Sequence, residues 1–566
     1  MKNNKRDVNG ATRQRSGQPG LLRGLGVAAV IMVAALLMVW VGGAAFAGRA
    51  QRAQAAADSA APPSTNDPHG FVDQSGNNVL PGSDKPLGLP KDRDKLFIPD
   101  ENYIKSPLPA GDEKYAKIDG NAIKKTEAEI VAISEKSRTD GNQYWGRISG
   151  TDYDHMTSDF MEAKFKKLGL QTKRWSNDLP PQWFPTSWDT ELVVGGKTIP
   201  LKSAWPVGQS VGTTNGPVEA EPVWVGLGFA ADFKGRDVKG KAVFVYSWPT
   251  DGGVFTSSQW TGAYERALNS GAAMVYLVQG FPGDQQSMLF GNYGGRVEMT
   301  PLSPVPAMTI SHDDGFAVRE AIEKGGDVKL RMRLDVKIVP GLHTDTVLAT
   351  LPGMSDETIL VMAHHDAYFD GATDNASGMA TSLELARYYA SIPKEQRRRT
   401  MVFEDSPTHH SPGVVGSVWM RMNMQDWLAN KVVLIANCEH TAETQIYYFG
   451  GGLLTTNMAS ARRWSAEGSD ALKKLVPATL RDYGVAVHMI SSTAGGDMGQ
   501  LHTTAPSFGV IDNILNHSTM DTVDWTPAYP MGMVARSYAK IFEQINKMSK
   551  EEIRGPNFHP TFPAPR

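Results

Sequence analysis

Continuous apolar runs alternate with helical patterns along the C-terminal half of the chain. The runs are ETILVMA, TMVFE, KVVLIAN and PSFGVI. Apolar residues recur at helical spacing over residues 376–391, 414–428, 459–475 and 530–548. Strands that are apolar at every position are typical of a parallel sheet covered on both faces. The pattern over 345–550 therefore predicts an α/β fold with a mainly parallel mixed sheet and helices on both faces.

The residues before this half show two other patterns. Helical spacing begins near residue 119, with Asn121 as the expected cap of a first helix, and a second helix is expected from about Asp154 to Leu168. Residues 191–338 instead contain short β-like runs between Gly- and Pro-rich turns, with short helical patterns near 261–270 and 315–324. We therefore expect a β-rich domain at 191–338, inserted in a discontinuous domain of 119–190 and 339–550, and a C-terminal tail at 551–566.

The N-terminal segment has the pattern of an export signal. Residues 1–24 carry six basic residues and one acid, and residues 25–47 carry no charge. The apolar stretch is long enough to cross a bilayer as a helix, and the basic flank predicts a cytoplasmic N-terminus with the remainder exported. We expect a single-pass signal-anchor. The alternative is cleavage near Ala47, which would give a secreted or periplasmic chain. Residues 48–118 are expected to be a flexible linker.

Composition narrows the chemistry. The chain has 566 residues and a formal net charge of −3, which argues against the basic face that a nucleic-acid-binding protein needs. A single cysteine, Cys438, excludes intrachain disulfides and cysteine-rich metal sites. Any metal ion must therefore be held by His, Asp and Glu.

Side chains of these types follow the predicted strands or lie in a late loop. The carboxyl ends of parallel strands meet at one edge of a sheet. Zinc accepts imidazole and carboxylate ligands, and one carboxylate can bridge two ions. Each residue has an ordinary structural explanation when taken alone; Asp374, for instance, could simply cap a helix. Together they indicate a metal site, and the candidates are His364, Asp366, Asp374, His409, His410, Glu439 and His517.

Three motifs, AHHDA, GATDNASG and NHSTMDT, occur in this order. Together they resemble the co-catalytic zinc exopeptidases of the aminopeptidase and glutamate carboxypeptidase family (clan MH). The resemblance covers about 120–185 and 340–550, and residues 191–338 resemble the inserted protease-associated (PA) domain of that family. It implies a phosphorylase/hydrolase-like fold, a peptide substrate and two zinc ions, with one ion as the alternative.

The resemblance also implies a role for each candidate. His364 would bind one ion, with Asp366 orienting its imidazole. Asp374 would bridge the two ions, Glu439 would complete the first site, and His517 would bind the second ion. Asp521 would support the loop of His517.

The chain departs from the family pattern after the second strand. The family has Glu-Glu there, the first as general base and the second as zinc ligand, whereas this chain has His409-His410. His410 can replace a carboxylate ligand, although the site then has one anion fewer. His409 becomes the candidate general base, because a neutral imidazole accepts a proton near neutral pH.

Three functional hypotheses follow from these residues. The first is an exported, membrane-anchored metallopeptidase, most simply an exopeptidase. The second is a receptor-like relative that kept the fold and lost turnover. The third is another zinc hydrolase or a glutaminyl-cyclase-like enzyme. Retention of the ligand set favours a metal-dependent enzyme. Side-chain specificity, the choice of peptide end and the oligomeric state stay open.

Overall fold

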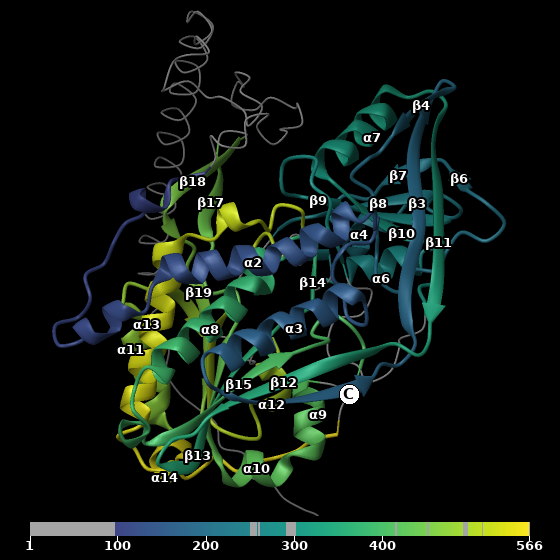
Figure 1. The fold of residues 1–566 in the computed structure, drawn as a ribbon. Coiled ribbons are helices and arrows are strands. Elements are labelled where there is room, and N and C mark those ends of the chain that lie inside the picture. The colour runs from purple at the N-terminus through teal and green to yellow at the C-terminus, as the bar shows by residue number, and fades with distance from the viewer. Residues whose placement is uncertain are drawn as a thin grey trace, which may run out of the picture. The chain divides into compact units, whose positions relative to one another are not determined.

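The computed structural model describes residues 97–564, except 250–256, 259–260, 290–301, 414–415, 450–451, 491–495 and 512. Its central element is a mixed sheet of eight strands (Figure 1). In spatial order the strands are β2 (Gln171–Asp178), β12 (His343–Leu351), β15 (Arg399–Ser406), β13 (Ser355–His364), β16 (Val432–Cys438), β21 (Ser507–Ile511), β19 (Arg462–Glu467) and β20 (Val487–Ile490). The four central strands, β15, β13, β16 and β21, run parallel.

Helices cover both faces of this sheet, because its strands are apolar on both sides. In β13, Ile359, Val361 and Ala363 belong to one core cluster. Leu360 and Met362 belong to another. The first core includes residues of α2 (Gly120–Thr139), α3 (Asp152–Lys167), α8 (Ser377–Ala390), α11 (Asp470–Asp482), α13 (Ala528–Ile545) and α14 (Lys550–Arg554), and the second includes residues of α9 (Gly416–Asn423), α10 (Gln425–Asn430) and α12 (Met498–Leu501). The predicted α/β architecture is confirmed.

The insertion contains two further sheets rather than one β-rich layer. One has the order β5 (Trp205–Pro206), β10 (Ala307–Ile310), β9 (Met274–Gln279), β8 (Ala242–Ser247) and β7 (Pro222–Trp224). The other has the order β4 (Lys197–Pro200), β3 (Gln182–Val194), β11 (Val328–Val339) and β6 (Val218–Ala220). The helices are α4 (Ala230–Phe233), α6 (Ala263–Leu268) and α7 (His312–Lys324). The insertion begins earlier than expected, at Gln182, because β3 pairs with β11 along its whole length.

Small elements complete the described part. Strand β1 (Gly146–Arg147) pairs with β14 (Ala367–Tyr368), and β17 (Thr444–Phe449) pairs with β18 (Gly452–Ala459). Short helical turns lie at η2 (Asp100–Asn102), η3 (Glu113–Lys117), η4 (Ala372–Ala376), η5 (Lys394–Gln396) and η6 (Val523–Trp525).

Two expected helix features are wrong. Residues 459–475 do not form one helix: β19 occupies 462–467 and α11 starts at Asp470. Gly468 separates the two with a φ of 137°, outside the helical region, and Ser469 caps α11. The cap of α2 is Asp119, whose side chain accepts a hydrogen bond from the backbone of Asn121.

Parts of the expected linker and tail are folded against the main domain. Within 97–118, Asp112 is buried and lies 2.6 Å from Lys540 of α13, and the Tyr483 hydroxyl donates to it. Beyond residue 550, α14 buries Ile553, and the backbone of Thr561 donates to Thr503. The sequence pattern did not predict these contacts. Each one involves a single residue, whereas hydrophobic periodicity reveals only repeated contacts along an element.

The expected cytoplasmic segment, 1–24, and signal-anchor, 25–47, lie outside the described residues. Among the helices that the structure does describe, none combines the length and apolarity needed to span a bilayer.

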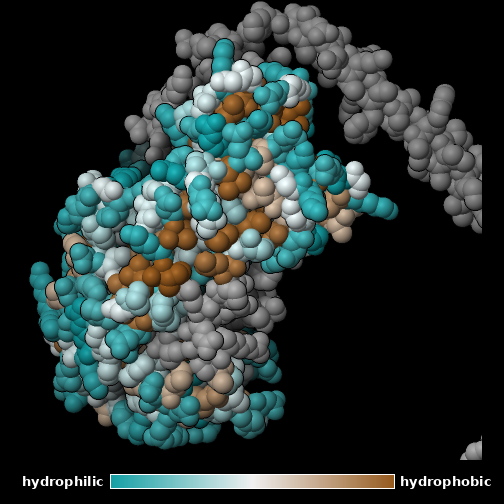
Figure 2. Space-filling view, turned by 90° about the vertical axis from the view of Figure 1, so that its right-hand side faces the viewer, coloured by the Kyte–Doolittle hydropathy of each residue, from teal (hydrophilic) through white to brown (hydrophobic). Residues whose placement is uncertain are grey.

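The surface is not uniformly polar. On the face shown in Figure 2, hydrophobic residues gather in a band between hydrophilic areas. The exposed large apolar side chains include Trp248 and Phe229 of the insertion.

The start of α8 depends on a close backbone approach at Gly378. A Cβ there would lie 2.1 Å from the Cys438 carbonyl oxygen, at the end of β16. We expect Gly378→Ala to lower the free energy of unfolding by about 1–3 kcal/mol, because neither backbone can move aside freely. Urea denaturation would measure this loss. Ser382→Ala in the same helix is the matched control: its buried hydroxyl has no hydrogen-bond partner among the described residues, so equal losses would contradict the steric explanation.

Candidate metal centre

The candidate ligands meet at the carboxyl edge of the parallel strands, where the sequence pattern placed them. His364 ends β13, and Asp374 lies in the turn η4 that leads into α8. The remaining candidates follow strands: His409 and His410 follow β15, Glu439 follows β16, and His517 follows β21. The strand ends therefore bring together residues that lie far apart in the sequence, from His364 to His517.

Asp374 is the centre of this group. One oxygen, Oδ1, lies 3.3 Å from Nε2 of His364 and 3.2 Å from Nε2 of His440. The other, Oδ2, lies 3.0 Å from Nε2 of His517 and 3.5 Å from Nε2 of His410. Burial alone would raise the pKa of the Asp374 carboxyl, but the surrounding imidazoles hold this pKa well below its usual range. The carboxylate is therefore ionised.

Asp374, His410 and His517 form a set with the spacing of a tetrahedral site. The two imidazole Nε2 atoms are 3.1 Å apart. Ligands at zinc distances of about 2.0–2.1 Å lie about 3.3 Å from each other in a tetrahedron, and the three separations here span 3.0–3.5 Å. The pKa of His517 is lowered to about 4, mainly by burial. Its ring is therefore in the neutral form that binds metal.

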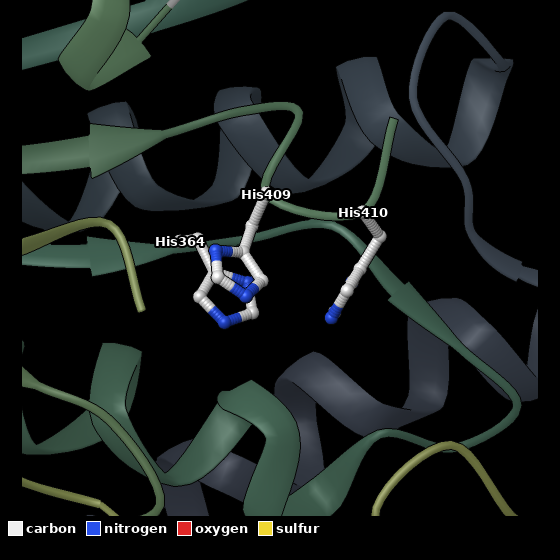
Figure 3. A group of neighbouring side chains, drawn as sticks. All are labelled: His364, His409 and His410. Atoms are coloured by element: carbon white, nitrogen blue, oxygen red, sulfur yellow. The ribbon is translucent and has the colours of Figure 1, made fainter. Parts of the chain in front are cut away.

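A second set joins His364, His409 and His410 (Figure 3). The rings of His364 and His409 are stacked, with centroids 4.2 Å apart and planes 17° apart. Ring-nitrogen lone pairs lie in the ring plane, so two nearly parallel stacked rings cannot both point at one ion. Glu439 is the alternative neighbour of His364, with Oε1 at 3.8 Å from Nε2, while its Oε2 accepts a hydrogen bond from Asn437.

Asp366 contacts His364 and also positions the His-His pair. Its carboxylate accepts the backbone N–H of His409 at 2.9 Å and of His410 at 2.8 Å. The His364 ring lies closer to the backbone oxygen of Asp366, at 3.2 Å from Nδ1, than to its carboxylate, at 3.6 Å. Asp366 therefore fixes the loop that carries His409 and His410.

Asp521 supports the turn of Asp374. Its two oxygens accept the backbone N–H groups of Thr373, at 2.7 Å, and of Asp374, at 3.0 Å. Burial and the nearby Asp374 charge raise the pKa of Asp521 to about 6, although these hydrogen bonds oppose the rise. The resemblance implied support of the His517 loop, which stays a prediction; the hydrogen bonds place Asp521 at the turn of Asp374.

The sequence reasoning did not select His440 or Arg147. His440 follows Glu439 directly, so its place after a buried strand was an available signal, and it has a positive φ of 48°. Arg147 lies in the two-residue strand β1, where no pattern marks it. Its buried guanidinium donates to the carbonyl oxygens of His365, Asp370 and Gly371, and so ties down the loop before Asp374.

The insertion contacts the loop that carries His517. The backbone of Met288 donates to the His517 carbonyl oxygen at 2.7 Å, and Gln286 and Thr519 are linked by two further hydrogen bonds. His517 has a φ of 57°, a conformation that a non-glycine residue rarely adopts. Contacts from the insertion therefore help to hold this ligand in place.

The donor atoms fit a divalent cation. Within the described part of the chain, Nε2 of His364, Oδ1 of Asp374 and both ring nitrogens of His440 are buried without a hydrogen-bond partner. Buried polar atoms of this kind are costly unless something pairs with them. Imidazole and carboxylate around a shared carboxylate form the donor set that zinc accepts.

Comparison with known proteins agrees with this geometry. Residues 346–472 match the model of peptidase family M28. The resemblance to zinc exopeptidases is confirmed. Aminopeptidase YwaD of Bacillus subtilis (strain 168) is 26% identical over 264 residues, which are 45% of this chain and 50% of that relative. The chain therefore matches about half the length of this curated relative.

Solved structures share the fold over most of the chain. A peptidase M28 precursor from Shewanella amazonensis SB2B has a TM-score of 0.59 at 17% identity, covering 79% of this chain and 99% of that one. BSAP, described as a zinc aminopeptidase from Bacillus subtilis, has a TM-score of 0.52 at 16% identity, covering 80% and 100%.

Replacing Asp521 should weaken the metal site without removing a ligand. Asp521→Asn exchanges one acceptor for a donor that faces the backbone N–H groups of Thr373 and Asp374. We expect zinc affinity to fall about 10- to 100-fold, as for other residues that orient ligands. Competition with a chromophoric chelator would measure this. The exposed Asp524 provides the control variant, Asp524→Asn, and equal affinity in both variants would contradict the assigned role.

Glu443 should make stability depend on pH. It is buried and accepts the backbone N–H groups of Ile514 and Leu515, and burial raises its pKa to about 7. Because the unfolded pKa is about 4.3, the folded state binds the extra proton between these values. The Glu443 contribution to stability is therefore present below about pH 4.3 and is lost as pH rises to 7, by about 3 kcal/mol at most.

Glu443→Gln cannot titrate and keeps an acceptor for the backbone. We expect wild type to lose stability relative to this variant as pH rises from about 4.5 to 7. Urea denaturation at several pH values would measure the difference, and a pH-independent difference would show that Glu443 is already ionised at low pH.

Proposed function

We propose that this chain is a zinc-dependent exopeptidase that cleaves peptides with two bound ions. The single observation that carries the proposal is the bridging position of Asp374, with imidazoles at both of its oxygens. The M28 match and the aminopeptidase relative support a peptidase-like hydrolase. His410 and His517 would hold one ion with Asp374, and His364 would hold the other with Glu439 or His440.

His409 is the proposed general base. Its side chain is 21% exposed, whereas that of His364 is fully buried and that of His410 is 4% exposed. Stacking on His364 keeps His409 off the same ion, so its ring remains available for proton transfer. The bound ions would polarise the substrate carbonyl and lower the pKa of a bound water.

The proton balance needs only one imidazole. Nε2 of His409 takes a proton from the attacking water as the new C–O bond forms. The same nitrogen returns this proton to the leaving amine as the peptide C–N bond breaks, so His409 ends in its starting state. The His-His pair therefore supplies one ligand and one base, the two roles of the family's Glu-Glu.

The basic residues 1–24 and the apolar stretch 25–47 support a membrane anchor, with the folded part exported. The inserted sheets are proposed to be a PA-like domain. The substrate is proposed to be a peptide.

Two variants separate the two roles of the His-His pair. With full-length protein in detergent, we expect about two zinc ions per chain and hydrolysis of an aminoacyl p-nitroanilide. His410→Ala should lose about one ion. His409→Ala should keep its zinc and lose about 10²- to 10⁴-fold in kcat, the range for a general base. Elemental analysis and initial rates measure these effects, with His312→Ala in α7 as the control.

Absence of zinc after incubation with excess metal would overturn the enzyme proposal and favour a receptor-like relative. Wild-type turnover in His409→Ala would remove His409 as the base. Hydrolysis of N-acetylated substrates at the same rate as free ones would contradict aminopeptidase-type exopeptidase action.

A further inference from the structure

The ring of His409 has a partner on the side away from its stacking neighbour. Nδ1 of His409 lies 3.1 Å from Oδ1 of Asp497, which immediately precedes α12. Nε2 lies on the side of the candidate ligands, 3.9 Å from Oε1 of Glu439. The two ring nitrogens therefore have different surroundings, a carboxylate on one side and the reaction space on the other.

Asp497 is a buried carboxylate. It is 5% exposed, and its Oδ2 has no hydrogen-bond partner within the described residues. A buried carboxylate is costly unless it is paired, and Oδ1 of Asp497 is paired with the His409 ring. Neither group of metal-ligand candidates includes Asp497. Its contact with the cluster runs through the His409 ring.

Other acids around Asp497 do not replace it as a partner of His409. Glu404, in β15, is buried with neither carboxyl oxygen hydrogen-bonded within the described residues, and burial raises its pKa well above the usual range. Burial therefore favours its protonated, uncharged form. Asp405, next to it, accepts from His365. Asp497 is thus the carboxylate that is aimed at His409.

We propose that Asp497 is a positioning residue that fixes the tautomer and the orientation of His409. Its Oδ1 accepts the Nδ1–H of the ring, so that Nε2 carries the lone pair and faces the attacking water. During turnover the Nδ1–H bond stays intact and only Nε2 gains and loses a proton. The same carboxylate stabilises the imidazolium that forms when Nε2 is protonated. This inference rests on the proposed role of His409 as base.

A double-mutant cycle tests this coupling. Asp497→Asn keeps the size of the side chain but can present an N–H to Nδ1, which favours the wrong tautomer. We expect kcat of the zinc-loaded, full-length chain to fall about 10²-fold or more, with KM and zinc content unchanged. In the His409→Ala background, Asp497→Asn should cause no further loss of kcat.

Two further variants keep the test selective. Asp497→Glu retains a carboxylate and should recover part of the lost kcat, which a purely structural role would not predict. Asp482→Asn, at the exposed end of α11, is the control for removal of one surface charge.

Each contrary result overturns the inference in a distinct way. An additive loss in the His409→Ala background would assign Asp497 a role independent of His409. A loss of zinc in Asp497→Asn would place its effect at the metal. Unchanged kcat in Asp497→Asn, with His409→Ala inactive, would reject positioning but keep His409 as base. Unchanged kcat in His409→Ala would reject His409 as the base, and this inference with it, while the zinc-dependent exopeptidase proposal would stand.

Discussion

One buried carboxylate organises this site. Asp374 draws imidazoles from four separate segments to its two oxygens, at 3.0–3.5 Å. In a low-dielectric interior that arrangement is stable only if positive charge is shared among these groups. The supporting contacts follow from this need: Asp521 fixes the turn of Asp374, and Asp366 fixes the loop of His409 and His410. The strand ends therefore set where the ligand candidates lie, and the hydrogen bonds of Asp521 and Asp366 set how their donor atoms are arranged.

Compared with a Glu pair at the same positions, His409 and His410 change the charge of the site rather than the arrangement of its donor atoms. The His410 imidazole adds no negative charge to the carboxyl groups around the cluster, whereas a Glu at this position would add one. Stacking on His364 keeps the two rings from pointing at one ion, and the His409 side chain is 21% exposed. An imidazole base becomes a cation when it takes up a proton, and a second positive charge beside the other imidazoles of the cluster costs free energy. The nearby carboxylate of Asp497 offsets that cost, which a Glu base would not incur.

The sequence predicted the parts of this structure that periodicity and strand ends encode. The continuous runs around β13, β15, β16 and β21 predicted the parallel centre, and the residues after them predicted where ligands lie. Gly468 and Ser469 were missed as a strand-to-helix junction, because Ala and Trp spacing across 459–475 also fits a helix. Arg147 and Asp497 could not be found by pattern, since each acts through one long-range contact that only the folded chain creates. The start of the insertion at Gln182 was likewise set by pairing with β11.

The contact between Met288 and the His517 backbone joins the insertion to the metal site thermodynamically. A metal ion that binds only when His517 has this conformation will also favour the arrangement of the insertion in which Met288 contacts the His517 backbone. By reciprocity, a molecule that rigidifies this part of the insertion would raise the affinity for a metal ion held by His517 by the same free energy. The insertion would then act on the centre through its backbone contacts alone, without supplying a ligand.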